Sequence, residues 1–201
     1  MSTGDRGDAR RRAAALLGLG LLLSACTSSE ADEVQAVERA TVAGTDTDLA
    51  ACPDQPDEPA ADSDLSAVPP IECFTGGTLD LGLAQGVPTV LNLWASWCQP
   101  CREELPWVQQ LAGLAGDRVR VVGVVSQDGV PQAASFADDA GVTLPGAFDG
   151  QGDVAAALGL RGLPHTVFLT ADGSVAFVRT GQVTSLDELR ALVAEHLGVQ
   201  L

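Results

Sequence analysis

The chain has 201 residues, of which 46% are hydrophobic, and this length is enough for one domain with a substantial core together with additional segments. Its formal net charge of −16 argues against nucleic acid and anionic membrane surfaces as partners, because both attract basic faces. The first residues and the five cysteines carry the information on compartment and chemistry.

The N-terminal residues predict export. Three arginines at positions 10–12 precede an apolar run over 13–23, which is shorter than the roughly 20 residues that span a bilayer, so a signal peptide is predicted over 1–25. The run ends in Leu-Ser-Ala-Cys, which resembles the lipobox of bacterial lipoproteins. The resemblance implies cleavage before Cys26 and attachment of a diacylglycerol to its sulfur, and therefore a lipid anchor on the extracytoplasmic face of the cell membrane. The alternative is ordinary signal-peptidase cleavage with no role for Cys26, and the sequence leaves both the general and the twin-arginine export routes open.

The next stretch, 26–70, is predicted to be an acidic tether between the lipid and the folded domain. It is rich in Ala, Asp, Glu and Pro and has too few apolar residues to form a core of its own. Within it, residues 31–43 have the composition of a short helix.

The cysteines divide into pairs. Export places the protein where disulfides persist, and four cysteines remain when Cys26 is set aside. Cys98 and Cys101 form one pair by position, which leaves Cys52 and Cys73 for a structural disulfide that would fasten the end of the tether to the domain. The alternatives are two free thiols, or a mixed site shared with the first pair.

A folded α/β domain is predicted over residues 71–201. Its predicted extended segments cover 87–95, 119–125, 143–148, 166–170 and 175–180, and its predicted helices cover 99–115, 131–140, 153–158 and 185–197. Gly76-Gly77 predicts a hairpin near the start of the domain, and Asp172-Gly173 predicts another between the last two strands. Strands separated by helices pair in parallel and strands joined by a tight turn pair antiparallel, so the sequence predicts a mixed central sheet flanked by helices.

The chemistry lies in the run LWASWCQPC at 93–101. Cys98 follows a buried strand and stands where a helix begins, so unpaired N–H groups and the positive end of the helix dipole favour its thiolate. Cys101 is one turn further along, on the side of the helix towards the sheet. This placement predicts that Cys98 is an exposed nucleophile and that Cys101 is a buried thiol that releases a mixed disulfide by internal attack.

The longer run from Trp94 to Pro106, WASWCQPCREELP, resembles the active-site region of TlpA/ResA-type thioredoxin-fold proteins, which are extracytoplasmic thiol–disulfide oxidoreductases. The likeness extends from about Glu72 to the end of the chain. It implies a thioredoxin-like fold with an N-terminal hairpin and an inserted helix and strand over 131–148. It also implies exchange of the Cys98–Cys101 dithiol or disulfide with cysteines of exported proteins, recycling by a membrane electron donor or acceptor, and no cofactor. Reduction, for example in cytochrome c maturation, is expected in preference to the formation of disulfides.

The resemblance also assigns the residues opposite the cysteines. Pro164 matches the cis-proline that thioredoxin folds place just before a strand, facing the cysteine pair. The main chain of Gly162 and Leu163 would then be free to pair with an extended substrate chain. Trp97, beside the nucleophile, is expected to form part of the same substrate surface.

An acidic residue is implied beside the resolving thiol. Glu104 stands three residues after Cys101, where ResA-like proteins carry an acid, and a partly buried carboxylate there can accept the proton of that thiol. Cytoplasmic thioredoxins place a buried acid at the position of Asn92, which cannot transfer a proton, so Glu104 is expected to take over this role.

Two other functions remain open from the sequence. Cys98, Cys101 and His165 could act as three soft ligands in a copper-binding or copper-delivery module, although the expectation is that the chain has no resident metal. The chain could also be a binding domain whose Cys98–Cys101 bond never cycles. Bound metal would support the first of these, and a bond that resists reduction would support the second.

Overall fold

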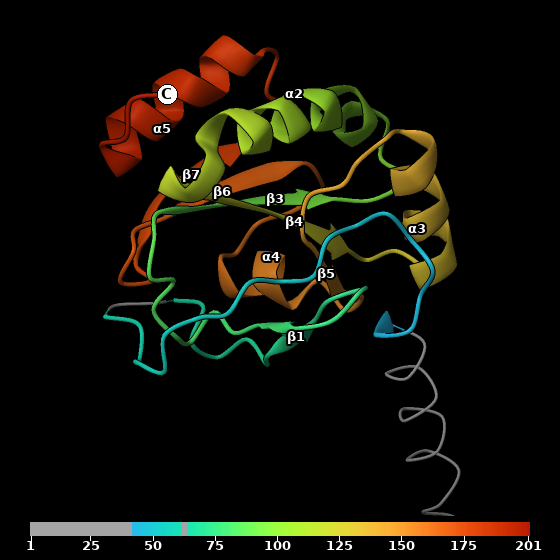
Figure 1. The fold of residues 1–201 in the computed structure, drawn as a ribbon, viewed down its shortest axis with the longest axis horizontal. Coiled ribbons are helices and arrows are strands. Elements are labelled where there is room, and N and C mark those ends of the chain that lie inside the picture. The colour runs from blue at the N-terminus through green and yellow to red at the C-terminus, as the bar shows by residue number, and fades with distance from the viewer. Residues whose placement is uncertain (1–41, 62–63) are drawn as a thin grey trace, which may run out of the picture.

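The computed structural model describes residues 42–61 and 64–201 of the chain (Figure 1). The signal peptide predicted over 1–25 and the lipidation site predicted at Cys26 lie outside these ranges. The helix predicted over 31–43 also lies outside them, except for its last two residues. Within the two described ranges, no helix is long and apolar enough to cross a membrane.

A five-stranded mixed sheet forms the centre of the molecule. Its strands are β3 (Thr89–Trp94), β4 (Arg120–Ser126), β5 (Gly146–Asp149), β6 (His165–Leu169) and β7 (Val175–Thr180). They stand in the order β5-β4-β3-β6-β7, with β3, β4 and β5 parallel and β6 antiparallel to both of its neighbours. The predicted mixed sheet is therefore confirmed, as is the predicted antiparallel pairing of the last two strands.

Helices cover both faces of this sheet, as Figure 1 shows. They are α2 (Gln99–Ala115), α3 (Val130–Asp139), α4 (Asp153–Ala157) and α5 (Leu186–Leu197), and a short 3-10 helix, Gly116–Arg118, follows α2. Helices α2 and α5 lie on one face, and α4 lies on the other. The start of α5, within the helix predicted over 185–197, is fixed by Ser185, whose side chain accepts a hydrogen bond from the N–H of Glu188.

The double-sided burial explains why β3 is almost continuously apolar. All six of its residues are buried. Because alternate residues of a strand point to opposite faces, Val90 packs into the core cluster of α2 and α5, whereas Leu91 and Leu93 pack into the cluster on the side of α4. Asn92 points to the same face as Val90, so a polar side chain is carried into the core below α2.

The inserted helix and strand implied by the resemblance are α3 and β5, and β5 pairs with β4 at the edge of the sheet. The ladder begins at Gly146, three residues later than the extended segment predicted from 143. The side-chain oxygen of Gln109 accepts the N–H groups of Thr143 and Leu144, and Pro145 has no N–H to offer. These three residues therefore have no free N–H donor for the sheet.

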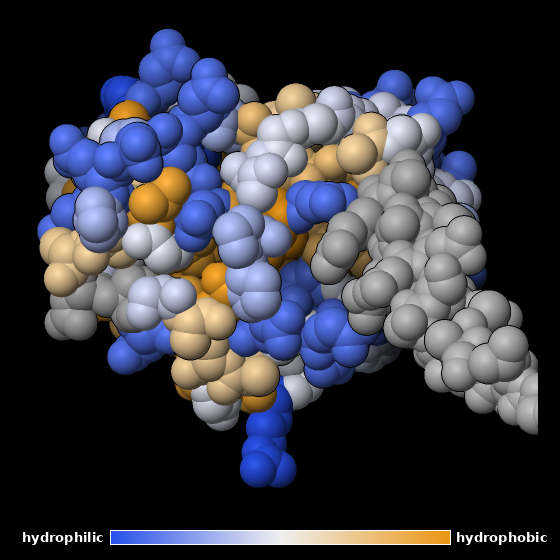
Figure 2. All heavy atoms as spheres, turned by 90° about the horizontal axis from the view of Figure 1, so that it is seen from below, coloured by the Kyte–Doolittle hydropathy of each residue, from blue (hydrophilic) through white to orange (hydrophobic). Residues whose placement is uncertain are grey.

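The N-terminal hairpin is present as β1 (Ile71–Glu72) and β2 (Thr78–Leu79), which pair antiparallel. It lies on the side of α4 (Figure 1). Viewed from this side, most of the visible surface is hydrophilic, with apolar side chains in scattered patches (Figure 2).

The described part of the predicted tether belongs to the folded domain, so the expected boundary at residue 70 is too late. Leu49, Leu65 and Val68 are buried in the core clusters. Main-chain hydrogen bonds reinforce this packing, including one from Ala84 N to the carbonyl oxygen of Glu58 at 2.8 Å. A few apolar residues spaced along an acidic segment are enough to fix it against an existing core, although composition alone shows no core of its own.

Candidate active site

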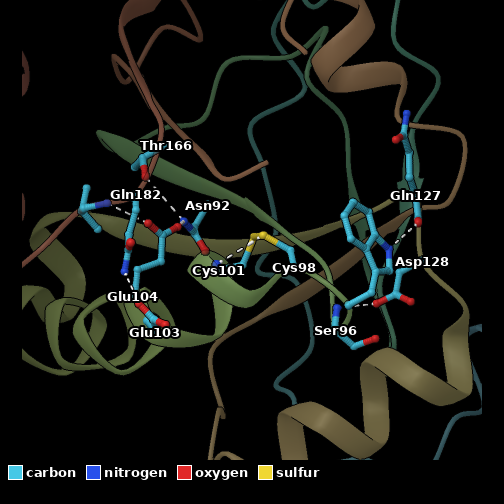
Figure 3. Close-up of a disulfide and its surroundings, with 12 residues drawn as sticks. Asn92, Ser96, Cys98, Cys101, Glu103, Glu104, Gln127, Asp128, Thr166 and Gln182 are labelled. Carbon is cyan, nitrogen blue, oxygen red and sulfur yellow. Dashed lines mark hydrogen bonds between the residues drawn. A yellow bond between two sulfur atoms is a disulfide. The ribbon is translucent and has the colours of Figure 1, made fainter. Parts of the chain in front are cut away.

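The start of α2 carries a disulfide between Cys98 and Cys101 (Figure 3). Cys98 is the N-cap residue, with an extended backbone, and its sulfur accepts a hydrogen bond from the N–H of Cys101 at 3.3 Å. Pro100 occupies the first turn, where its missing N–H costs nothing. A negative charge on the Cys98 sulfur would thus meet a backbone donor and the positive end of a long helix, as the sequence predicts.

The two sulfur-bearing residues are less accessible than expected. Cys98 is 4% exposed and Cys101 is fully buried. The prediction of an exposed Cys98 is therefore wrong for the disulfide-bonded state, in which its sulfur is bonded to a buried partner and lies within the core cluster below α2. Cys98 is nevertheless the more accessible of the two residues, as predicted.

The peptide bond between Leu163 and Pro164 is cis, as the resemblance implies. Strands β3 and β6 pair so that Leu93 faces His165, which places Pro164 at the same end of the sheet as the loop that leads to Cys98. Pro164 is buried, whereas Leu163 is half-buried and Gly162 is exposed. The structure therefore brings Gly162, Leu163 and Pro164 to the end of the central strands at which the loop to Cys98 begins.

Glu104 is fully buried in α2 and both of its carboxylate oxygens have a partner (Figure 3). Oε1 accepts a hydrogen bond from Asn92 Nδ2 at 2.7 Å, and Oε2 accepts one from the N–H of Val183 at 2.8 Å. Burial raises the pKa of Glu104 to about 7, because the carboxylate loses its hydration; the bonds from Asn92 and Val183 and the charge of Arg179 act in the opposite direction. An acid of this kind exchanges a proton readily near neutral pH.

The contacts of Glu104 were not predicted from the sequence. Asn92, on β3, and Val183, on the loop between β7 and α5, are brought to Glu104 by tertiary packing. The only sign of such a contact in the sequence is Asn92 itself, an amide side chain with apolar residues on both sides of it in β3. The adjacent Glu103 is exposed, and hydrogen bonds from the side chains of Gln99 and Gln182 lower its pKa.

Trp97, which directly precedes Cys98, carries an exposed aromatic ring bound to a loop residue, Gln127; Figure 3 shows Gln127 and Asp128 on the side of the disulfide away from Glu104. It is 59% exposed, and its Nε1–H donates to the carbonyl oxygen of Gln127 at 2.9 Å. The preceding N–H of Ser96 donates to Asp128 at 2.6 Å. The bond to Gln127 therefore orients the indole, and the bond to Asp128 holds the main chain before it on the loop after β4, whereas Trp94 is fully buried in the core.

The three ligands considered for copper do not come together. Across residues 42–61 and 64–201, no group of three His, Cys, Asp or Glu side chains is placed to hold a metal ion. The ring of His165 is buried, and neither of its nitrogens has a hydrogen-bond partner among the described residues. Since Thr166 faces Asn92, the neighbouring His165 points to the opposite face of β6.

The second disulfide, between Cys52 and Cys73, is also present. It joins the N-terminal segment to the β1–β2 hairpin, where the N–H of Cys52 also donates to the carbonyl oxygen of Gly76 at 3.0 Å. Of the three arrangements that the sequence leaves open for these cysteines, the structure has the bonded pair.

Comparison with known proteins identifies relatives over most of the domain. The family model described as Redoxin matches residues 65–193. The chain is 32% identical over 111 residues to the thiol:disulfide interchange protein DsbE of Vibrio cholerae, a match that covers 55% of this chain and 59% of that protein. It is 29% identical over 115 residues to the thiol-disulfide oxidoreductase ResA of Halalkalibacterium halodurans, with 57% of this chain and 65% of that protein covered. The chain thus spans less than two thirds of the length of these two curated relatives.

A solved structure shows the same architecture. The structure of MTB dsbF in its mixed oxidized and reduced forms aligns with a TM-score of 0.58 and 31% sequence identity, covering 69% of this chain and 98% of that one. These likenesses confirm the predicted thioredoxin-like fold and the resemblance to TlpA/ResA-type proteins.

Proposed function

We propose, because the chain belongs to the Redoxin family, that it is an extracytoplasmic thiol–disulfide oxidoreductase acting on cysteines of exported proteins. One observation carries this proposal: a Cys98–Cys101 disulfide caps a long helix and lies in the same core as the buried carboxylate of Glu104. The names of the relatives support it, since DsbE is a thiol:disulfide interchange protein and ResA is a thiol-disulfide oxidoreductase.

The proposed reaction transfers two electrons from the protein to a substrate disulfide. The Cys98 thiolate attacks one substrate sulfur, the substrate S–S bond breaks, and the other substrate sulfur leaves as a thiolate that takes a proton from solvent. Glu104 accepts the proton of the Cys101 thiol, and the resulting thiolate attacks the Cys98 sulfur. The mixed disulfide breaks and the second substrate sulfur leaves as a thiolate that takes up the proton held by Glu104. The protein is left with the Cys98–Cys101 bond and an ionised Glu104.

The proposed substrate is an extended segment of polypeptide that contains a cysteine. The main chain of Leu163 makes no hydrogen bond within the described part of the protein, so its N–H and carbonyl groups can pair with such a segment. Exposed Gly162 leaves room beside them, and the fixed indole of Trp97 offers an apolar contact near the nucleophile.

We place the protein in the reducing direction, with cytochrome c maturation as one setting, on the strength of the resemblance to ResA-type proteins. A membrane electron donor would then return the disulfide to the dithiol. The reduction potential tests this direction: a value of about −270 mV fits a reductant, and a value of about −120 mV would make the protein an oxidant that forms disulfides.

A lipid anchor at Cys26 is the proposed means of membrane attachment, and it rests on the Leu-Ser-Ala-Cys pattern. Labelling of the full-length chain in cells with a radioactive fatty acid tests it. The wild-type chain is expected to be labelled and to sediment with membranes, and the Cys26→Ser chain is expected to lose the label. Equal labelling of both chains would contradict the proposal.

Trapping of intermediates tests the proposed chemistry. The Cys101→Ser chain, expressed in cells, is expected to accumulate mixed disulfides through Cys98, because the internal attack that releases the substrate is lost. These adducts appear on non-reducing gels of the cell envelope and vanish on reduction. The Cys98→Ser/Cys101→Ser chain is the matched control, and adducts that persist in it would contradict the assigned roles.

A further inference from the structure

The side chain of Asn92 has one polar atom without a partner. Asn92 is fully buried, its Nδ2 donates to Glu104 at 2.7 Å and approaches the hydroxyl oxygen of Thr166 at 3.5 Å, and its Oδ1 has no hydrogen-bond partner in the described part of the protein. Buried amide oxygens are normally paired, so an unpaired one beside a titratable group needs a physical reason.

The charge of Glu104 explains the present orientation of the amide. Both carboxylate oxygens face N–H donors, from Asn92 and from the main chain of Val183, which is the arrangement that an ionised carboxylate requires (Figure 3). A half-turn of the Asn92 amide would direct Oδ1 at this negative charge. Ionised Glu104 therefore holds Asn92 with its NH₂ group inward and leaves Oδ1 unpaired.

Protonation of Glu104 reverses this preference. A carboxylic acid has an O–H that needs an acceptor, and neither of its present partners offers one. The main-chain N–H of Val183 cannot turn, but the amide of Asn92 can, and its unpaired Oδ1 is the acceptor that the proton would need. The hydroxyl of Thr166 suits both orientations, because it accepts from Nδ2 in one and donates to Oδ1 in the other.

We propose that Asn92 is a positioning residue whose amide reverses each time Glu104 gains or loses a proton. This inference rests on the proposed function, in which Glu104 takes the proton of the Cys101 thiol before the internal disulfide forms. The Nδ2 donor stabilises the carboxylate that receives the proton, and the Oδ1 acceptor stabilises the acid once it has formed. A single rotatable amide thus serves both protonation states of a group that water does not reach.

The other charged or titratable groups near Glu104 are engaged elsewhere or point away, so none of them offers an acceptor for its proton. Arg179 of β7 and Glu188 of α5 both act on Glu104 through space, but they are joined to each other by an ion pair at 3.0 Å. Glu103, on the same helix, is bound to Gln99 and Gln182 at the surface. His165 of β6 points to the opposite face of the sheet.

The first test follows the amide directly, with the oxidised wild-type protein and no substrate. The side-chain NH₂ resonances of Asn92 are recorded by NMR from about pH 5.5 to about pH 8.5, while the carboxyl carbon of Glu104 reports its titration. The Asn92 resonances are expected to shift with the same midpoint as Glu104, and to stay fixed over this range in the Glu104→Gln protein. Resonances that ignore the titration of Glu104 in the wild-type protein would overturn the proposal.

The second test separates positioning from packing by kinetics. In Asn92→Leu the side chain keeps a similar volume but can neither donate to the carboxylate nor accept from the acid. The bond to the charged carboxylate is the stronger of the two, so the pKa of Glu104 is expected to rise by about one unit from its value of about 7. The ionised fraction of Glu104 at pH 7, and with it the rate of release of a mixed disulfide, is then expected to fall about fivefold. The rate is expected to recover as the pH is raised, whereas the first attack by Cys98 keeps its wild-type rate. A uniform loss at every pH would indicate a packing defect and overturn the proposal.

Thr166→Val and Thr166→Ser provide a milder matched pair in case Asn92→Leu does not fold. Thr166→Val removes the hydroxyl and is expected to shift the pH profile of mixed-disulfide release less than Asn92→Leu does. Thr166→Ser retains the hydroxyl and is expected to keep the wild-type profile. Identical profiles for the two variants would contradict the part assigned to Thr166. The proposed function would be refuted by a different result, namely that the wild-type protein exchanges no disulfides. The titration of Asn92 with Glu104 is measured without any exchange reaction, so failure of one proposal can be told from failure of the other.

Discussion

The two disulfides of this chain have different surroundings, and the difference indicates what makes a cysteine pair reactive. Cys98 and Cys101 are three positions apart at the N-terminus of a long helix, whereas Cys52 and Cys73 are 21 positions apart and join an N-terminal segment to a hairpin. The reactive pair also has a carboxyl group of raised pKa in the adjoining core, and the exposed indole of Trp97, bound to Gln127, directly before it in the chain. Both bonds are largely buried, so burial alone does not separate a structural bond from one that cycles.

The largest expected effect is on exchange itself. Cys98→Ser is expected to abolish the reduction of a protein disulfide, because no other described cysteine is the N-cap residue of a helix that would stabilise its thiolate. The matched control is the Cys52→Ser/Cys73→Ser protein, which is expected to keep most of the wild-type rate at a temperature where it remains folded. Turnover of a substrate disulfide with a chemical dithiol as electron source measures both. Loss of exchange in the folded control would remove the distinction between the two bonds.

The free energy of unfolding is expected to depend more on the Cys52–Cys73 bond than on the Cys98–Cys101 bond, the reverse of the order expected for exchange. Opening the 21-position loop of Cys52–Cys73 is expected to lower the free energy of unfolding by about 3 kcal/mol, whereas opening the Cys98–Cys101 loop is expected to cost about 2 kcal/mol or less, because a short loop restricts the unfolded chain less. Urea denaturation of the two double serine variants at one pH measures the difference. A larger loss from the active-site pair would show that this bond, too, is mainly structural.

Features of the fold that depend on local sequence were predicted correctly, whereas contacts between distant segments were not. The bounds of α2 agree with the prediction because apolar spacing and the early Pro100 are local signals, and the Asp172-Gly173 turn is another. The contact of Glu104 with Val183 spans 79 positions and depends on how a loop packs over α2, so no local pattern contains it. The burial of Leu49 was missed for a related reason: composition describes a segment on its own, not a core supplied by the rest of the chain.

The carboxyl group beside the reactive pair predicts a pH dependence of stability. The pKa of Glu104 is raised from 4.5 to about 7, so this group stabilises the fold fully below pH 4.5 and loses that contribution as the pH rises through about 7. The loss amounts to up to about 3 kcal/mol. In the oxidised protein, the free energy of unfolding is expected to fall less between these pH values in Glu104→Gln than in wild type. Denaturant titrations at several pH values measure it, with Glu103→Gln as the exposed control; curves of equal slope would show that Glu104 is not the titrating group.

The exposed indole beside the reactive pair is expected to have the smallest effect, and one confined to large substrates. Trp97 is 59% exposed but held by Gln127, so a polypeptide can bury it without first restricting its motion. Trp97→Ala is therefore expected to raise the KM for a protein disulfide by about tenfold, or about 1.4 kcal/mol, and to leave the reaction with a small dithiol unchanged. Leu114→Ala is the control, because Leu114 is 42% exposed and lies near the C-terminal end of α2, whereas Trp97 precedes its N-terminal end. An equal effect of Trp97→Ala on the small dithiol would mean that the indole acts on the sulfur of Cys98 and not on the substrate chain.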